Sequence, residues 1–208
     1  MSRSSTTSAI AVLTVLTIAL SARANYRDGS KAIKISGGED HTLVVTANNW
    51  AWACGPNGYR YQDVTYYSCV LGIGSNDPYL KRNILVRIHG PGDVGYVEGI
   101  CDIAAGWQHS LALDVNDSVW SWGWNSKGQL GIGDSPYETT PVQVFRGDQA
   151  QDPCQPSAYL KHITDISAGR SGQHSLAVDG EGHAYGWGYN QYGQCGNDRS
   201  GHFVKDFV

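Results

Sequence analysis

The chain has 208 residues, of which 41% are hydrophobic and only 16% are charged. Its 26 glycines, 12 tyrosines and single methionine favour a globular all-β protein with many short strands and tight turns over a helical one. The formal net charge is −4 and the basic residues do not cluster, which argues against nucleic acid or an anionic membrane as a partner.

Residues 1–24 have the form of a secretory signal peptide. Arg3 precedes an apolar run from Ala9 to Leu20, and the small residues Ala22 and Ala24 mark the expected cleavage site. The run is shorter than the roughly 20 residues that a membrane-spanning helix needs, so cleavage is favoured over a membrane anchor. We therefore expect a secreted mature chain that starts at residue 25 and does not stay in the membrane.

Three copies of one pattern follow. In each copy a histidine is followed 14 residues later by a glycine and 16 residues later by an asparagine. The histidines lie 68 and 65 residues apart, a spacing that suits a repeat of one small sheet. The residues concerned are His41, His109 and His174, then Gly55, Gly123 and Gly188, and finally Asn57, Asn125 and Asn190.

Each copy is patterned as antiparallel strands. The strings "HSLALDVNDSVWSWG" and "HSLAVDGEGHAYGWG" alternate apolar and polar residues around a turn of Asn, Asp or Gly, which predicts a β-hairpin. The glycines of "GQLGIGD" interrupt the pattern and "TPVQVF" supplies a further short strand. About four strands per copy correspond to one propeller blade, with repeats near residues 31–99, 100–160 and 161–208.

The string "AGWQHSLALDVNDSVWSWGWNSKGQLGIG" resembles the repeat of the regulator of chromosome condensation family. The resemblance covers residues 31–208 and implies a β-propeller, whose full ring has seven blades. Three repeats imply a partial propeller of about three blades with open apolar faces, closed either by further blades or by other copies of the chain. Family members range from a nuclear nucleotide-exchange factor to a plant photoreceptor and a secreted bacterial inhibitor of β-lactamases, so the fold does not name the function.

The repeat histidines are expected to be structural. Equivalent positions in successive sheets are about 10 Å apart, too far to share one metal ion held at about 2.0 Å. We expect each ring to be satisfied by backbone hydrogen bonds inside its own blade. The serines that follow His109 and His174 point away from the histidine face, and no nucleophile or phosphate-binding motif is present, so neither catalysis nor a cofactor is expected.

An insertion in the first copy, "GYRYQDVTYYSCV" at residues 58–70, makes it nine residues longer than the second copy. Its aromatic rings and guanidinium are typical of protein-recognition patches. A decorated loop without a partner is the alternative. The candidate binding residues are Tyr59, Arg60, Tyr61, Tyr66 and Tyr67.

Secretion would let the five cysteines pair. We expect a bridge from Cys54 to Cys69 across the insertion and a weaker second pair of Cys101 and Cys154. Cys195 stands where the second copy has a leucine, so it is expected to be a small buried packing residue.

Two short motifs fit a secreted protein. Asn116 begins the sequon Asn-Asp-Ser in a predicted turn, where we expect a glycan. Arg146, Gly147 and Asp148 resemble the tripeptide that integrins bind, although three-residue matches also arise by chance.

The predicted function is a secreted, non-enzymatic β-propeller scaffold that binds another protein through face loops. The alternative is a regulator of an enzyme, either a secreted inhibitor or a factor resembling the guanine-nucleotide exchange factors of the family. The partner's identity stays open, and self-association through the open blade faces is a further possibility.

Overall fold

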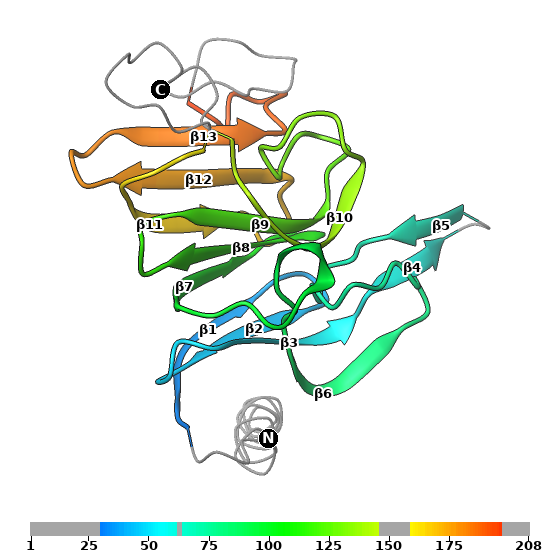
Figure 1. Cartoon of the computed structure of the whole chain (residues 1–208). Coiled ribbons are helices and arrows are strands. Elements are labelled where there is room, and N and C mark those ends of the chain that lie inside the picture. Colours follow the sequence, from blue (N-terminus) through cyan, green and yellow to red (C-terminus); the bar gives the residue numbers. More distant parts are fainter. Residues whose placement is uncertain (1–29, 62–63, 146–158, 197–208) are drawn as a thin grey trace, which may run out of the picture.

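The computed structural model describes residues 30–61, 64–145 and 159–196 (Figure 1). The expected signal peptide, Cys154 and the tripeptide at residues 146–148 lie outside this part of the chain. No helix within the described ranges is both long and apolar enough to cross a membrane.

Three antiparallel sheets lie one above another (Figure 1). We call them blades 1, 2 and 3 in chain order. Blade 1 has the strand order β1-β2-β3-β6, blade 2 the order β10-β9-β8-β7 and blade 3 the order β11-β12-β13. This arrangement confirms the predicted all-β fold, a partial β-propeller of three blades.

The strand bounds are as follows. Blade 1 contains β1 (Ala32–Gly37), β2 (Thr42–Thr46), β3 (Ala51–Pro56) and β6 (Lys81–Arg87). Blade 2 contains β7 (Ile100–Ala105), β8 (His109–Asp114), β9 (Val119–Trp124) and β10 (Tyr137–Gln143). Blade 3 contains β11 (Ile163–Ala168), β12 (His174–Asp179) and β13 (Ala184–Gly188). A hairpin of β4 (Gly58–Tyr61) and β5 (Val64–Tyr67) and a 3-10 turn, η1 (Pro91–Asp93), complete the elements.

The blades pack face to face through two apolar clusters. Successive side chains of a strand point to opposite faces, so alternate residues of β8 serve both clusters. Ala112 lies in the cluster between blades 1 and 2, whereas Leu111 and Leu113 lie in the cluster between blades 2 and 3. The core is therefore made between sheets, and each blade depends on its neighbours.

The loops that precede the histidine strands β2, β8 and β12 converge. Backbone N–H groups of Glu39 and Trp107 donate to the carbonyls of Gly106 and Gly172 in the next blade, each over 3.4 Å. Ser171 of blade 3 donates to the Glu39 carboxylate of blade 1 at 3.1 Å. A contact that skips one blade indicates that the three sheets are arranged around a common axis, as in a propeller.

Candidate protein-binding surface

The repeat histidines form hydrogen bonds between blades. His41 Nε2 lies 2.9 Å from Ser110 Oγ of blade 2, and this hydroxyl donates to the Val70 carbonyl of blade 1 at 3.0 Å. Because the serine proton goes to the carbonyl, His41 donates through Nε2–H. The indole N–H of Trp122 donates to the same carbonyl at 2.8 Å.

The same four groups join blades 2 and 3. His109 Nε2 lies 3.0 Å from Ser175 Oγ, which donates to the Gln129 carbonyl at 2.8 Å, and Trp187 Nε1 donates to that carbonyl at 2.9 Å. We call this arrangement of histidine, serine, carbonyl and tryptophan the interblade relay. Its recurrence in equal register shows that it is part of the repeat.

The relay corrects one expectation from the sequence. The structural role assigned to the histidines stands, but their rings bind serine hydroxyls of the next blade and not backbone groups of their own blade. The serine does point away from its own blade's histidine, and it thereby faces the histidine of the preceding blade. Nothing in one repeat read by itself discloses this pairing.

Burial keeps these rings neutral. It lowers the pKa of His41 to about 4, and burial followed by the neighbouring His41 and His174 lowers the pKa of His109 to about 3. Burial also lowers the pKa of half-buried His174. A neutral imidazole donates one proton and needs no counter-ion, which suits a packed interface.

The repeat glycines make room at the histidines. Gly55, Gly123 and Gly188 have φ values of 124°, 104° and 100°, and a Cβ on each would lie 2.5–2.7 Å from the carbonyl oxygen preceding the histidine strand. A side chain there would collide with backbone. The glycine 14 residues after each histidine is therefore required by close strand packing.

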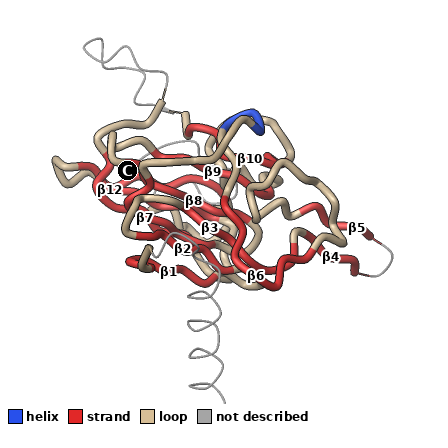
Figure 2. The backbone as a smooth tube through the Cα atoms, turned by 60° about the horizontal axis from the view of Figure 1, so that its bottom comes forward, coloured by secondary structure: helices blue, strands red, loops and turns tan. Residues whose placement is uncertain are grey.

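The tyrosine-rich insertion is a β-hairpin that projects from the body of blade 1 (Figures 1 and 2). In this β4–β5 hairpin Tyr59 pairs with Tyr66 and Arg60 pairs with Thr65. The five candidate binding residues thus lie on one two-stranded element. The insertion was expected as a loop, and blades 2 and 3 have no hairpin at this place within the described residues.

The base of the hairpin is held by blade 2. The rings of Tyr67 and Tyr137 stack with centroids 6.0 Å apart and planes 23° from parallel, and Asn76 Nδ2 donates to the Tyr137 hydroxyl at 3.4 Å. Inside blade 1, Asn57 Oδ1 accepts the Leu71 N–H at 3.3 Å and so closes the insertion at its two ends. A fixed base orients the projecting strands.

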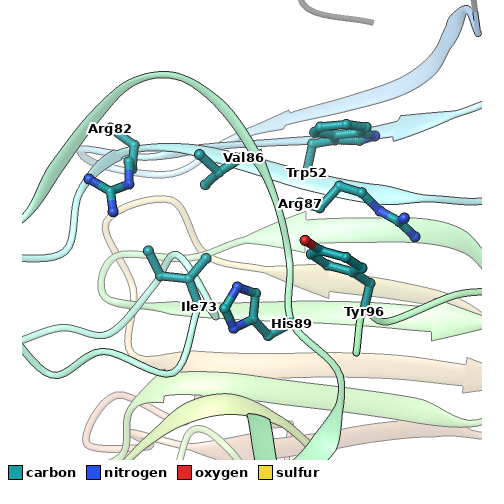
Figure 3. Close-up of a pocket in the computed structure, with 7 residues that line it drawn as sticks. All are labelled: Trp52, Ile73, Arg82, Val86, Arg87, His89 and Tyr96. Atoms are coloured by element: carbon teal, nitrogen blue, oxygen red, sulfur yellow. The ribbon is translucent and has the colours of Figure 1, made fainter. Parts of the chain in front are cut away.

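A pocket of about 460 Å³ lies beside the hairpin on blade 1 (Figure 3). Gly55 pairs with Arg82, and the hairpin begins at Gly58, so the Arg82 end of the pocket is close to the hairpin base. The lining combines apolar, aromatic and basic side chains. These are Trp52, Ile73, Arg82, Val86, Arg87, His89 and Tyr96.

Arg87 is clamped at this pocket. Its guanidinium carbon lies 3.9 Å from the Trp50 ring centroid and 4.3 Å from the Tyr96 ring centroid, and Nη2 bonds Glu98 at 3.2 Å. His89 Nδ1 lies 2.5 Å from Asp93 Oδ1. Because Arg87 and His89 already have carboxylate partners, the pocket is a rigid mixed surface and not a strong anion site.

The predicted Cys54–Cys69 bridge is wrong, since both cysteines are free thiols. Cys54 packs against the cluster of Val44 and Leu85, whereas Cys69 is completely buried where the hairpin returns, so the two belong to different environments. Cys101 is also free, and its expected partner Cys154 lies outside the described residues. Cys195 is 2% exposed, which confirms the prediction of a buried packing residue.

Asn116 lies exposed in the turn between β8 and β9, as expected for a glycosylation acceptor, and the glycan itself stays a prediction. Among the described residues, His, Cys, Asp and Glu side chains form no group of three that could hold a metal ion.

Models of the regulator of chromosome condensation (RCC1) repeat match residues 100–129 and 163–194, and a second model of this repeat matches residues 116–178. These ranges contain the strands of blades 2 and 3. The relay serines and tryptophans of both blades lie inside them.

Curated relatives match more of the chain. The Arabidopsis thaliana ultraviolet-B receptor UVR8 is 29% identical over 187 residues, which are 87% of this chain and 35% of the receptor. The human RCC1-like G exchanging factor-like protein is 27% identical over 163 residues, which are 78% of this chain and 30% of that protein. The chain thus spans about a third of the length of these relatives.

Solved structures share the fold. Prp20p from Saccharomyces cerevisiae matches with a TM-score of 0.63 at 21% identity, over 86% of this chain and 36% of Prp20p. Human WBSCR16 matches with a TM-score of 0.58 at 20% identity, over 77% of this chain and 34% of WBSCR16. Residues 100–194 therefore contain repeats of the regulator of chromosome condensation (RCC1) family, and the chain shares the fold of these solved structures.

Proposed function

We propose that this chain is a secreted, non-enzymatic β-propeller scaffold that binds another protein through the β4–β5 hairpin and the adjoining pocket of blade 1. The observation that carries the proposal is the hairpin itself, a tyrosine-rich element that departs from the repeat and projects from an otherwise regular stack of sheets (Figure 2). Departures on a rigid scaffold are where binding residues concentrate.

The hairpin and the pocket offer complementary kinds of contact. Tyrosine supplies a large contact area with few rotatable bonds, so little conformational entropy is lost on binding. Beside it, the clamped Arg87 and the rings of Trp50 and Tyr96 form a preorganised aromatic and basic surface. We expect the partner to present apolar side chains together with a carboxylate that reaches Arg82.

The relatives support a protein as the partner class. The structure of Prp20p is described together with its binding to Gsp1p and histones, and a second structure has yeast RCC1 bound to Kap60. The alternative function, regulation of an enzyme, is favoured by one observation, the match to the human RCC1-like G exchanging factor-like protein.

Site-specific photocrosslinking tests the proposal. We would introduce p-benzoylphenylalanine at Tyr67, which is 38% exposed, and as a control at Val115 in the β8–β9 turn, which is 54% exposed. Irradiation in extracellular fluid should join one protein to the position 67 probe and not to the position 115 probe. Equal labelling from both positions would count against the hairpin, because the more exposed probe reports non-specific contact.

The identity of the crosslinked protein separates the two functions. A receptor or structural protein supports the scaffold. An enzyme whose rate changes on addition of the chain, for example nucleotide release from a GTPase or hydrolysis by a lactamase, supports the regulator.

Secretion has its own test. Material recovered from the medium of a eukaryotic host should start at residue 25 and lose mass on glycosidase treatment, because Asn116 would pass the glycosylation machinery. Retention in the cell with an intact N-terminus would contradict this part of the proposal, and the partner would then be sought by the same crosslinking in a cell extract.

A further inference from the structure

We propose that blade 3 of this chain binds blade 1 of a second copy, head to tail, through the relay that joins the blades within one chain. The evidence is that the first and the last of the three described blades carry the two halves of an interblade contact. In the following, the outgoing side of a blade faces the next blade and the incoming side faces the preceding one.

The outgoing side of blade 3 is built like that of blade 2. In blade 2 the relay carbonyl belongs to Gln129, whose side chain accepts the Lys127 N–H at 2.9 Å, and the loop is closed by a 2.9 Å bond from the Leu130 N–H to Asn125 Oδ1. In blade 3 the Gln194 side chain accepts the Tyr192 N–H at 2.9 Å, and Cys195 N–H donates to Asn190 Oδ1 at 2.8 Å.

The following glycine is also equivalent in the two blades. Gly131 has φ 67° and a Cβ on it would lie 3.0 Å from the Trp187 indole nitrogen of the next blade, while Gly196 has φ 79°. The carbonyl of Gln194 is therefore preformed as an acceptor. His174, at the position of His109, supplies the donor ring and is half-buried where His109 is fully buried.

The incoming side of blade 1 carries a matching apolar residue that is exposed among the described residues. Ile103 and Ile166, the second isoleucines of β7 and β11, belong to the clusters shared with the preceding blade and are 6% and 7% exposed. Ile35 occupies the same register in β1, opposite Val44, yet it is 69% exposed. A blade placed before β1 would bury Ile35 as blades 1 and 2 bury its counterparts.

Charge favours the same pairing. Lys34 of blade 1 and Asp102 of blade 2 hold the same register position in their blades and form a 3.0 Å salt bridge. Asp165, at this position of blade 3, is exposed. In a head-to-tail contact Asp165 would meet Lys34 of the second copy, a pair of opposite charges.

The contact differs from the internal ones at three positions. Thr42 replaces the relay serine and keeps the hydroxyl that His174 and Gln194 of another copy would bind. Cys54 replaces the relay tryptophan, so the second donor to the carbonyl is lost. The Gly172 N–H, which corresponds to the Trp107 donor, is already bonded to Gly169 at 2.8 Å. The association is therefore weaker than the internal contacts and depends on concentration.

Sedimentation of the full chain over a range of concentrations gives the first test. We expect the wild-type chain to associate reversibly and Ile35→Asp to lower its association constant at least ten-fold. Val115→Asp, which alters a 54% exposed valine in the β8–β9 turn, should leave the association constant unchanged. Cys54→Trp restores one donor and should strengthen association about five-fold. A chain that stays monomeric at all concentrations would overturn the proposal.

Mixing two variants tests the direction of the contact. Ile35→Asp disrupts the incoming side of blade 1, so that only the outgoing side of blade 3 can still bind another copy. Leu176→Asp, at the register of buried Leu111, disrupts the outgoing side, so that only the incoming side can still bind. Each should be monomeric alone, and the mixture should form a complex of two copies. If Leu176→Asp unfolds, Asp165→Lys at the exposed surface replaces it. A mixture that stays monomeric, or variants that associate alone like the wild type, would show that other surfaces are responsible and reject the proposal.

Discussion

His109 Nε2 and Ser175 Oγ lie 3.0 Å apart although 66 residues separate them in the chain. The bond joins β8 of blade 2 to β12 of blade 3, and it is completed by the Gln129 carbonyl, to which Ser175 donates. All three groups are buried between the sheets. The stability of the stack therefore depends on polar groups that are satisfied only when two blades meet.

Ser175→Ala should lower the free energy of unfolding by about 1–3 kcal/mol, because it leaves the buried His109 N–H without an acceptor. Urea denaturation of the full chain measures this change. Ser167→Ala, at an exposed position of β11, is the matched control and should stay within about 0.5 kcal/mol of wild type. Equal effects from the two substitutions would show that the relay contributes nothing.

The repeat histidines predict a loss of stability in mild acid. Burial lowers the pKa of His41 to about 4 and of His109 to about 3, below the value of 6.5 in an unfolded chain. Below pH 6.5 the unfolded state therefore binds more protons than the folded state. The free energy of unfolding has its full value above pH 6.5 and falls as the pH decreases toward 4. The slope is at most about 1.4 kcal/mol per pH unit for each histidine.

Melting temperatures measured between pH 7.5 and 4.5 test this dependence. His109→Asn should lower the melting temperature at pH 7.5 and also flatten its dependence on pH, because one of the three histidines with a lowered pKa is gone. A variant that keeps the wild-type slope would show that carboxylates, and not the buried histidines, cause the acid sensitivity.

The β8–β9 turn depends on Asp114. Its Oδ1 accepts the N–H groups of Asn116 and Ser118 at 2.8 and 3.0 Å, and its Oδ2 accepts the Trp120 indole N–H at 2.9 Å. Asp114→Ala removes both acceptor oxygens, and with them all three hydrogen bonds, and should cost about 1–3 kcal/mol of unfolding free energy. Asp40→Ala, at an exposed aspartate, is the control, and a loss as large there would contradict the assignment.

The sequence predicted the blades because their signals are local. The 14-residue interval from His109 to Gly123 fixes one hairpin, and the same interval recurs in the other copies. The interblade relay could not be predicted in this way, because His41 and Ser110 are paired by the packing of whole sheets. For the same reason the stacking of Tyr67 on Tyr137, the pocket around Arg87 and the separation of Cys54 from Cys69 became visible only in three dimensions.

The free cysteines predict an order of alkylation. Burial, followed by the nearby Glu138, raises the pKa of Cys69 to about 12, and burial raises the pKa of Cys195 to about 11. Iodoacetamide at pH 8 should therefore modify the half-buried Cys54 and Cys101 of the native chain before these two, and all four after unfolding. Peptide mapping without reduction that found Cys54 joined to Cys69 would contradict the free-thiol state.

The central claim is that a rigid propeller scaffold presents the β4–β5 hairpin to a partner protein. Replacing residues 58–70 with Ser-Lys-Gly-Gln, the corresponding residues 126–129 of blade 2, removes the hairpin. The closing bond from Leu71 N–H to Asn57 has its counterpart in the Leu130–Asn125 bond, so blade 1 should still fold. The decisive measurement is the affinity of this variant for the protein that crosslinks to position 67. The account predicts at least a hundred-fold loss of affinity with a melting temperature close to wild type, and wild-type affinity in the folded variant would contradict it.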